Sequence, residues 1–339
     1  MIPSFRTVLF GFGKIGGDYA TDPLTARHYS YATHAQALDA HPDFDWGAVV
    51  DSSEEALEKA VQRWKIPIVA SDAKELAEIY KPEVAVIATP PLDRIALIDQ
   101  LPTLRAVLVE KPLGMTTSEE ENFLQACRQR DILVQVNYWR RADTTFRALA
   151  DGKLNDLIGT PQAVFGVYGN GLLNNGAHLI DFTRMLFGEV EKVQAVCGCE
   201  PTSAEPLPGD VDLPFNLRTT NGLMFSMHPI EFSQYREIGL DIWGRRGRLT
   251  ILNEGLRIFF YPRSQNRAIQ DEMELNYDKP ELLESTVGQA LYQIYGNLAM
   301  ALKADTPLWS PGESARKTRR VVQAILNSAQ SHGMPVAVA

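Results

Sequence analysis

The stretch that decides the fold of this 339-residue sequence is Thr7-Val8-Leu9-Phe10-Gly11-Phe12-Gly13-Lys14-Ile15-Gly16. Residues 7–10 form a short apolar run, and glycines follow at positions 11, 13 and 16. In such a turn the first glycine permits the tight bend. The second lets the backbone approach a pyrophosphate, and the third lets the next helix pack on the strand. Because the helix N-terminus then offers amide donors, the stretch predicts a dinucleotide-binding turn.

Five further apolar runs follow at regular intervals, separated by segments with helical spacing. The runs cover residues 46–50, 66–69, 84–88, 106–109 and 132–136. Strands that alternate with helices indicate a parallel, doubly wound sheet with right-handed crossovers. An arbitrary α/β domain that binds nothing at its first turn is the competing interpretation, and six regularly spaced strands disfavour it. Residues 118–130 are predicted to form a helix with Ser118 as N-cap and Glu121 at the capping-box position.

The pattern changes after about residue 139, where β-like runs have fewer helices between them. These runs cover residues 160–168, 190–197, 223–227, 237–243 and 248–252, and helical patterns follow at 287–303 and 312–329. We therefore predict a dinucleotide-binding domain over residues 1–139. An α+β domain with a large, mostly antiparallel sheet is predicted over residues 140–339.

Composition narrows the classes of partner. A net charge of −9 argues against nucleic acid, and the basic cluster of Lys317, Arg319 and Arg320 is typical of a solvated helix face. No run reaches the roughly 18 apolar residues of a membrane span, and the N-terminal residues lack a signal-peptide pattern. We therefore expect no membrane partner and a cytoplasmic location.

The three cysteines, Cys127, Cys197 and Cys199, are too few and odd in number for a disulfide framework. Cys197-Gly198-Cys199 lacks the second ligand pair of a zinc site. No bound metal is expected.

Asp51 ends the second predicted strand and is the expected partner of an adenosine ribose. Its carboxylate would repel a 2′-phosphate, which favours NAD, although the hydroxyls of Ser52 and Ser53 could accommodate one, so NADP stays open. Asp51 lies 35 residues beyond Gly16, whereas the usual spacing is about 20. Residues 17–33 are therefore interpreted as an insertion, either a solvated loop or a flap over the cofactor or substrate.

Glu110-Lys111-Pro112 directly follows the apolar run at residues 106–109. A lysine at the carboxyl end of a parallel strand points into the crevice where α/β proteins bind ligands. A cofactor and a proton-handling residue are expected to meet there, which favours an enzyme over a simple nucleotide binder.

Several motifs together resemble the glucose–fructose oxidoreductase / inositol dehydrogenase / rhizopine-catabolism (Gfo/Idh/MocA) family. In chain order they are residues 11–16, Asp51, Thr89-Pro90-Pro91, residues 110–114 (EKPLG), residues 171–181 (GLLNNGAHLID) and residues 240–249 (LDIWGRRGRL). The resemblance implies a Rossmann domain followed by an open-faced α/β domain whose sheet forms a homodimer or homotetramer. It also implies a nicotinamide cofactor, a sugar, cyclitol or nucleotide-sugar substrate, and a cis Lys111-Pro112 bond.

The resemblance further implies that Lys111 and His178 lie near the nicotinamide and the reacting carbinol. A histidine can act as base or acid near neutral pH, and a lysine is a fixed cation that stabilises developing negative charge. The family commonly has an aspartate where this chain has Asn174. Because an amide binds a hydroxyl but accepts no proton, we assign proton handling to His178 and Lys111 and substrate anchoring to Asn174. Asp181 shares the helical face of His178 and is expected to orient it or to fix local structure.

The other candidate residues come from the same motifs and the segments beside them. The cofactor set is Gly11, Phe12, Gly13, Lys14, Ile15, Gly16, Asp51, Ser52, Thr89, Pro90, Glu110 and Lys111. The substrate set is Asn137, Tyr138, Arg140, Tyr168, Asn170, Asn174 and Tyr235. An oxidoreductase acting on a non-sugar substrate and a non-catalytic dinucleotide-binding sensor are the alternatives. Intact Lys111 and His178 argue against the sensor.

Overall fold

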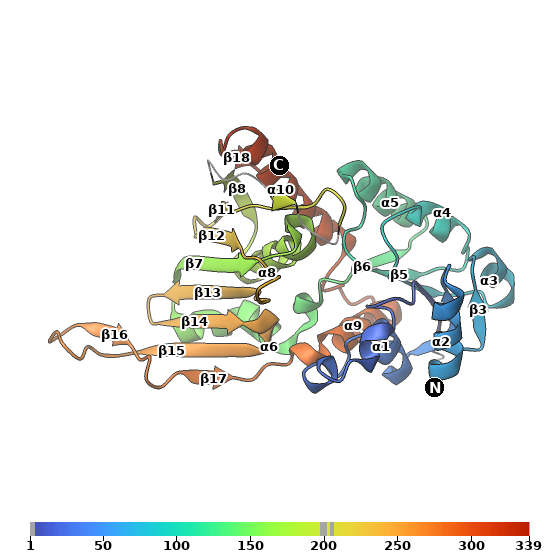
Figure 1. The fold of residues 1–339 in the computed structure, drawn as a ribbon, viewed down its shortest axis with the longest axis horizontal. Helices are drawn as coiled ribbons and strands as arrows, with labels where there is room; N and C mark the ends of the chain where they lie inside the picture. The colour runs from blue at the N-terminus through green and yellow to red at the C-terminus, as the bar shows by residue number, and fades with distance from the viewer. Residues whose placement is uncertain (1–3, 197–201, 204–206, 339) are drawn as a thin grey trace. The chain divides into compact units, whose positions relative to one another are not determined.

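The computed structural model describes residues 4–196, 202–203 and 207–338, and the chain divides into two compact units. The first consists of Met1–Asp143 with Gly288–Arg316, and the second of Thr144–Val287 with Lys317–Ala339. The first unit therefore takes in a segment, 288–316, that a boundary at residue 139 assigns to the second domain. Each unit is built on one main β-sheet (Figure 1).

Six parallel strands form the sheet of the first unit, in the order β3-β2-β1-β4-β5-β6. They are β1 (Phe5–Phe10), β2 (Phe44–Val50), β3 (Ile68–Ala70), β4 (Val84–Ile87), β5 (Ala106–Val109) and β6 (Leu133–Val136). Each corresponds to a predicted apolar run, so the doubly wound parallel sheet is confirmed. The strand order reverses between β1 and β4, and this reversal opens a ligand crevice at the carboxyl ends of the strands.

Helices cover both faces of this sheet. They are α1 (His34–Ala40), α2 (Glu54–Trp64), α3 (Lys74–Ile79), α4 (Arg94–Asp99), α5 (Thr117–Gln129) and α9 (Ala290–Ala304). The helices α3, α4 and α5 pack with one set of alternate strand residues, including Val8 and Val107. The helices α1, α2 and α9 pack with the other set, including Leu9 and Leu108. Because both faces are buried, the strands read in the sequence as unbroken apolar runs.

The N-cap of α5 lies two residues before the predicted one. Thr116 accepts the amide proton of Glu119 through its hydroxyl, and the Glu119 carboxylate accepts the amide proton of Thr116. The sequence holds two overlapping capping-box patterns, and this earlier one forms. Glu121 instead pairs with Arg128. The prediction of Ser118 as N-cap is therefore wrong.

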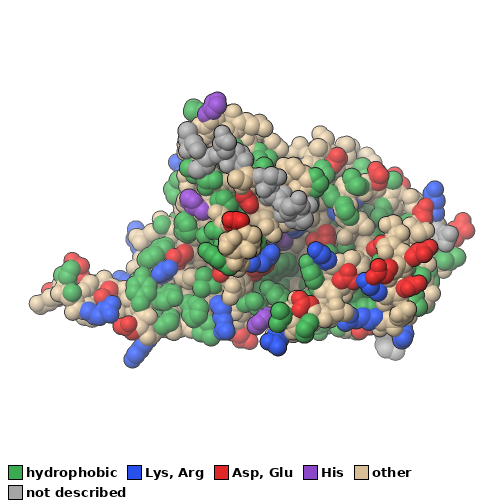
Figure 2. All heavy atoms as spheres, in the orientation of Figure 1, with side chains coloured by type: hydrophobic (Ala, Val, Ile, Leu, Met, Phe, Trp, Pro, Cys, Tyr) green, Lys and Arg blue, Asp and Glu red, His purple; other side chains and the backbone are tan. Residues whose placement is uncertain are grey.

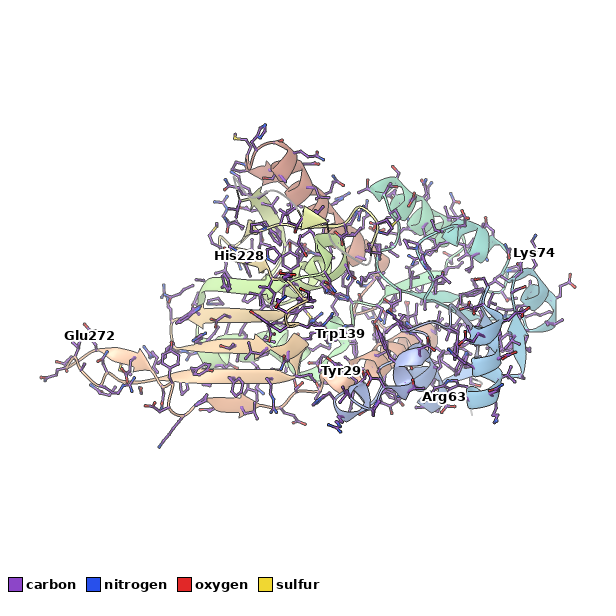
Figure 3. The ribbon with its side chains drawn as sticks, in the orientation of Figure 1. Tyr29, Arg63, Lys74, Trp139, His228 and Glu272 are labelled. Atoms are coloured by element: carbon purple, nitrogen blue, oxygen red, sulfur yellow. The ribbon has the colours of Figure 1, made fainter. Side chains whose placement is uncertain are left out.

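Residues 17–33, the predicted insertion, are anchored on two helices of the first unit. They contain two short 3₁₀ turns, η1 (Asp18–Thr21) and η2 (Thr25–Arg27). Arg63 of α2 donates to the carbonyl of Ala20 at 3.0 Å, and the Tyr31 ring stacks on Tyr292 of α9 with centroids 4.7 Å apart. Figure 3 labels Arg63 on α2 and Tyr29 in this segment. The insertion is thus a packed part of the first unit.

The insertion interrupts the helix that follows the glycine turn. One helical turn forms first, with the Gly17 amide donating to Gly13, and the chain then leaves. It returns at α1, where the amides of His34 and Ala35 donate to the carbonyls of Ile15 and Gly16. The helix is therefore resumed across a gap in the sequence, which explains the long spacing to Asp51.

A mixed, mostly antiparallel sheet is the core of the second unit, in the order β16-β15-β14-β13-β7-β12-β11-β8-β18 with β17 beside β15. Its strands are β7 (Pro161–Tyr168), β8 (Val190–Ala195), β11 (Phe215–Thr219), β12 (Met224–Pro229), β13 (Gly239–Gly244), β14 (Gly247–Leu252), β15 (Arg257–Gln265), β16 (Met273–Leu275), β17 (Glu281–Leu283) and β18 (Val336–Ala337). A separate pair is β9 (Thr202–Ser203) with β10 (Val211–Asp212). The predicted sheet is confirmed, although β11 and the long β15 were not predicted.

One face of this sheet packs with four helices, the last of which lies in the second unit only from Lys317 onward. They are α6 (Thr144–Ala148), α7 (Leu154–Ile158), α8 (Ala177–Phe187) and α10 (Gly312–Gln330), with a π-helical turn, η4 (Leu149–Lys153), between α6 and α7. The opposite face carries exposed aromatic side chains, among them Phe165 at 44% and Trp243 at 38% exposure. Arg248 stacks over the Trp243 ring at 4.4 Å. Figure 2 shows hydrophobic side chains gathered over the region of β13 to β15.

Candidate active site

The glycine turn is closed at its first and third positions and open at its second. Gly11 has a φ of +87°, which glycine adopts without strain. A Cβ on Gly16 would lie 2.9 Å from the Cα of Phe12, so a larger residue cannot fit there. Among the described residues, nothing lies within 4 Å of the corresponding point at Gly13. This open position is where a pyrophosphate approaches the backbone, so the turn fits a dinucleotide.

Asp51 reaches from the end of β2 to the glycine turn. Its Oδ2 accepts the Phe12 amide at 2.6 Å, and its Oδ1 accepts the Ser53 amide at 2.9 Å. The carboxylate is therefore fixed beside the turn, in the position that binds an adenosine ribose in this fold. Lys14 and Ser52 are exposed nearby.

Arg94 connects the turns that follow β4 and β5. Its Nη1 donates to the carbonyls of Pro112 and Leu113 at 2.7 and 2.8 Å. Its Nη2 donates to Thr89 and Glu110 at 3.3 and 3.0 Å. Arg94 is 4% exposed, and burial lowers its pKa to about 10, so it stays charged at neutral pH. Arg94 was not predicted as a site residue; its one sequence signal is a position just beyond Thr89-Pro90-Pro91.

Glu110, directly before Lys111, is held by side chains from two other elements. Asn137 donates to its Oε1 at 2.6 Å, and His34 Nε2 lies 3.0 Å from the same oxygen. Burial alone would raise the pKa of Glu110. The hydrogen bonds from His34 and Asn137 and the nearby charges of His34 and Lys111 outweigh burial, so the pKa lies below its ordinary value. The Lys111-Pro112 bond is cis, as the resemblance implies.

Tyr138 and Arg140 lie in and beside the turn after β6 and are buried in the structure. Arg140 stacks on the ring of Trp139 at 4.1 Å, and Trp139 is labelled in Figure 3. Both belong to the first unit, as do Lys111, Thr89 and Asn137.

In the second unit, Asn174 lies in a π-helical turn, η5 (Gly171–Gly176), and His178 follows at the start of α8. The Asn174 side chain donates to the carbonyl of Asn170 at 3.0 Å. Asp210, 6% exposed, accepts the amides of Leu173 and Asn174 at 2.9 Å each. Asp212 also accepts the Gly171 amide at 2.9 Å.

Two carboxylates therefore hold the first turn of the segment that leads to His178, where the helix dipole favours negative charge. Neither Asp210 nor Asp212 was predicted as a site residue. Their one sequence signal is an Asp-x-Asp pattern after Pro208-Gly209.

Tyr168 and Tyr235 occupy opposite environments. Tyr168 is fully buried, its hydroxyl donates to the Leu213 carbonyl at 2.6 Å, and burial raises the pKa of the phenol. Since this hydroxyl is used inside the second unit, we remove Tyr168 from the predicted substrate contacts. Tyr235 is 67% exposed between β12 and β13.

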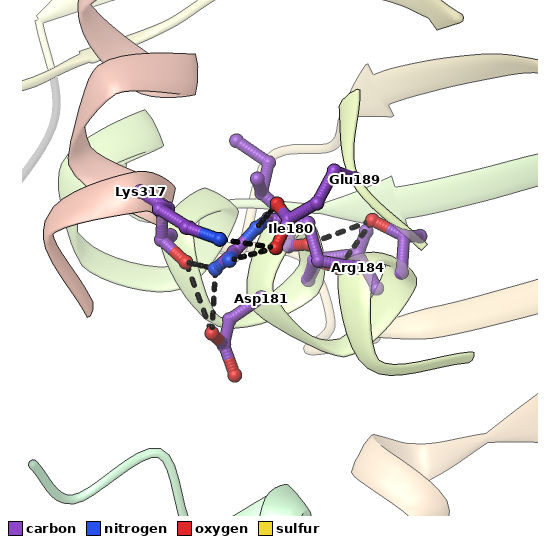
Figure 4. Close-up of polar contacts among 8 residues, drawn as sticks. Ile180, Asp181, Arg184, Glu189 and Lys317 are labelled. Carbon is purple, nitrogen blue, oxygen red and sulfur yellow. Dashed lines mark hydrogen bonds and ion pairs between the residues drawn. The ribbon is translucent and has the colours of Figure 1, made fainter. Parts of the chain in front are cut away.

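Asp181 takes part in a buried polar cluster that joins α8 to α10 (Figure 4). Thr318 donates to its Oδ1 at 2.9 Å, and Arg184 Nη1 lies 3.3 Å from the same oxygen. Arg184 also donates to Glu189, and these bonds lower the Glu189 pKa to about 2. Of the two roles expected for Asp181, these contacts support the one of fixing local structure.

Among the described residues, no group of three or more His, Cys, Asp or Glu side chains could hold a metal ion. Cys197 and Cys199 lie outside the described residues. No described helix is long and apolar enough to cross a membrane.

Two family models match the chain. An oxidoreductase-family NAD-binding Rossmann fold matches residues 5–138, and the C-terminal α/β domain of the same family matches residues 168–338. The chain belongs to the Gfo/Idh/MocA oxidoreductase family. The resemblance drawn from the glycine turn, the Glu-Lys-Pro motif and the histidine segment is thereby confirmed. As a Gfo/Idh/MocA member, the chain carries an NAD-binding Rossmann domain.

Named relatives of this Gfo/Idh/MocA chain include trans-1,2-dihydrobenzene-1,2-diol dehydrogenase from Mus musculus. The two are 30% identical over 158 residues, which is 41% of this chain and 47% of that protein. The chain thus spans about half the length of the curated relatives it matches.

Solved structures share the fold over the whole chain. A levoglucosan dehydrogenase in complex with NADH and levoglucosan has a TM-score of 0.77 and 17% identity, with 99% of both chains covered. The WlbA dehydrogenase from Bordetella pertussis in complex with NADH and UDP-GlcNAcA has a TM-score of 0.72 and 18% identity, also with 99% of both covered.

Proposed function

We propose that this chain is an NAD(P)-dependent oxidoreductase. It would transfer a hydride between nicotinamide and a hydroxyl or keto carbon of a sugar, cyclitol or nucleotide sugar. The proposal depends chiefly on the position of Lys111, which lies in the turn at the carboxyl end of β5. Arg94 connects this turn to the one after β4 by hydrogen bonds to Glu110 and Thr89. Ligands of doubly wound sheets bind at such a crevice, and a cation there stabilises an oxygen that gains negative charge.

When bound, the nicotinamide would supply the hydride acceptor for oxidation or the hydride donor for reduction. In oxidation, the carbinol hydrogen would leave as a hydride, taking both electrons of the C–H bond. The hydroxyl proton would pass to His178 as the carbonyl forms. Lys111 would hold the same oxygen through its ammonium group. Asn174 would bind a neighbouring hydroxyl and take no proton. Lys111 lies in the first unit and His178 in the second, so their joint action on one substrate is part of this proposal.

We also propose that NAD is preferred over NADP. The Asp51 carboxylate accepts the amides of Phe12 and Ser53, so it is held beside the glycine turn with its charge where a 2′-phosphate would lie. Titration of NADH and NADPH fluorescence measures the preference. Tighter binding of NADPH by the wild type would refute it.

A non-sugar substrate is the second candidate, and one observation favours it. The sequence relatives are named for a trans-diol on a six-membered ring. Cyclitols and pyranose sugars also carry adjacent ring hydroxyls. We therefore propose that the site takes a ring with two adjacent hydroxyls, one oxidised with the help of Lys111 and His178 and the other bound by Asn174.

The test is a turnover screen on cyclitols, sugars, nucleotide sugars and a trans-dihydrodiol, followed by cofactor absorbance. We expect one class to react, and Lys111→Met and His178→Gln to lose about 10²- to 10⁴-fold in kcat while still binding NADH. NADH binding without Lys111-dependent turnover of any compound would favour the sensor and overturn the proposal. If Asn174→Asp left both substrate affinity and the pH–rate profile unchanged, the anchoring role would be wrong.

A homodimer or homotetramer through the exposed face of the second unit's sheet completes the proposal. Phe165, Trp243 and the stacked Arg248 supply the aromatic and arginine side chains that are enriched at interfaces. Light scattering should show Trp243→Glu as a smaller species than the wild type. Ile79→Glu, on the exposed side of α3, is the control and should match the wild type. A monomeric wild type would refute the proposed assembly.

A further inference from the structure

His34 is a fully buried histidine with a partner on each ring nitrogen. Nδ1 lies 2.8 Å from the hydroxyl of Tyr295 on α9, and Nε2 lies 3.0 Å from Oε1 of Glu110. Tyr295 is also fully buried, and its ring meets the imidazole edge-on at 5.9 Å. Burial, with the Glu110 charge, raises the pKa of Tyr295 well above its ordinary value, so the phenol stays neutral. The ring of His34 is therefore held from both sides.

The backbone of His34, at the start of α1, is hydrogen-bonded to the glycine turn of residues 11–16. Its amide donates to the Ile15 carbonyl at 3.0 Å, and the Ala35 amide donates to Gly16 at 2.9 Å. The capping box of Thr33 and Gln36 fixes the start of α1 at the same point. His34 thus joins the turn that would bind the cofactor to the residue directly before Lys111.

Filling buried space does not by itself call for a histidine. Replacing a buried polar cluster with apolar side chains of similar volume is often neutral or stabilising. A buried imidazole with two hydrogen bonds instead specifies one orientation of its partners, because each bond is directional and costly to leave unmade. Of the two partners of His34, Glu110 is the one next to Lys111, so its carboxylate is the group whose orientation matters here.

The charge of Glu110 depends on this contact. The groups that face it are His34 from α1, Asn137 after β6, Tyr295 from α9, the adjacent Lys111, and the buried guanidinium of Arg94. Burial favours the protonated acid, whereas the donors favour the carboxylate, and the bond from His34 is the largest favourable contribution. Without His34 the largest contribution that favours the carboxylate would be lost. Glu110 would then take up a proton at a higher pH.

We propose that His34 is a positioning residue. From the start of α1, where it is bonded to the glycine turn, it holds the Glu110 carboxylate in place and ionised. It thereby fixes the position of Lys111, the next residue in the chain. Tyr295 fixes the ring of His34 and takes no part in turnover. The effect on turnover rests on the proposed role of Lys111, whereas the effect on Glu110 does not.

The experiment compares His34→Phe, His34→Gln and the control His41→Phe. Glutamine can place an amide donor where Nε2 lies, so it keeps the bond to Glu110 and loses the one to Tyr295. His41 is another buried histidine of the same region, and its ring packs on Phe44 and Tyr292. The readouts are kcat and KM, the pH–rate profile, NADH affinity, and the carboxyl ¹³C titration of Glu110 in the protein without cofactor.

We expect His34→Phe to lower kcat by roughly ten- to a hundredfold, with NADH affinity retained. The acid limb of its pH–rate profile and the Glu110 titration should both move to higher pH. His34→Gln should restore most of kcat and return both curves toward those of the wild type. His41→Phe should lower stability and leave both curves unmoved.

Three results distinguish failure of the inference about His34 from failure of the proposed function. An unmoved Glu110 titration in a folded His34→Phe variant would overturn the inference. A loss of kcat equal in His34→Phe and His34→Gln, with unmoved curves, would also overturn it, because it indicates packing alone. Absence of turnover in the wild type with every substrate would count against the proposed function instead, and the Glu110 titration would still decide the role of His34.

Discussion

Replacing Gly171 with alanine tests whether Asp210 holds the turn that carries Asn174. Gly171 has a φ of +97°, and Gly188, at the end of α8, has a nearly equal φ of +91°. Alanine at either position suffers a penalty of about 1–3 kcal/mol for holding a positive φ. The two sites differ in what surrounds them. A Cβ on Gly171 would lie 2.6 Å from Cγ of Asp210, whereas nothing described lies within 4 Å at Gly188.

The difference between the two variants measures the contribution of Asp210. To make room, the Asp210 carboxylate must shift, which weakens its bonds to the amides of Leu173 and Asn174, accepted at 2.9 Å each. A hydrogen bond to a charged group contributes about 1.5–3 kcal/mol, so losing both costs about 3–6 kcal/mol. We expect Gly171→Ala to be destabilised beyond Gly188→Ala by up to this amount.

Urea unfolding monitored by circular dichroism, with the slope of each transition compared, measures the two free energies of unfolding. Turnover measured on the same samples should fall in Gly171→Ala, because Asn174 shifts, and should be kept in Gly188→Ala. Equal destabilisation of the two variants would refute the reasoning, since it would mean that only the backbone penalty acts.

Three further expectations follow from single contacts. Arg94→Lys should lower kcat by roughly tenfold or more, because one ammonium cannot serve four carbonyls in two turns. Arg130→Lys, which loses two carbonyl bonds at the other end of α4, should not, and equal losses would contradict the role of Arg94. The Glu189 pKa of about 2 lies below its ordinary value, so Glu189 stabilises the fold above about pH 4.5 and loses this effect as the pH falls toward 2. Thermal melts of wild type and Glu189→Gln should therefore converge as the pH falls, and a constant gap would argue against the pairing with Arg184. Burial raises the pKa of the Cys127 thiol to about 12, so iodoacetamide should label Cys127 far more slowly in the folded protein than in urea. Peptide mass spectrometry measures this, and fast native labelling would contradict the buried thiol.

The fold was largely predictable because its signals are local. Six apolar runs predicted six parallel strands, and the turn at residues 11–16 marked where the first strand ends. The N-cap of α5 was misplaced because two capping-box patterns overlap by two residues, and local sequence does not decide between them. The run Ile258-Phe259-Phe260-Tyr261 carries a strong strand signal, yet β15 was not predicted, so this omission does not reflect a weak pattern.

The site was predictable where a residue lies inside a motif. Lys111, Asp51 and Gly16 follow from their positions at strand ends and in the glycine turn. Tyr168 shows the limit of this reasoning. Its position in a strand before the histidine segment was compatible with substrate contact, and only its burial against Leu213 assigned its hydroxyl elsewhere.

The sequence by itself determined the doubly wound sheet, the dinucleotide turn and the place of Lys111 at a strand end. Each depends on a periodicity or a glycine spacing within a few residues. The tertiary structure alone decided that α9 packs on the first unit, that Asp210 holds the turn of Asn174, and that His34 joins Glu110 to Tyr295. These contacts join residues 36, 76 and 261 positions apart. A hydrogen bond across such a separation depends on how the elements pack in space, and it leaves no periodic trace in the chain.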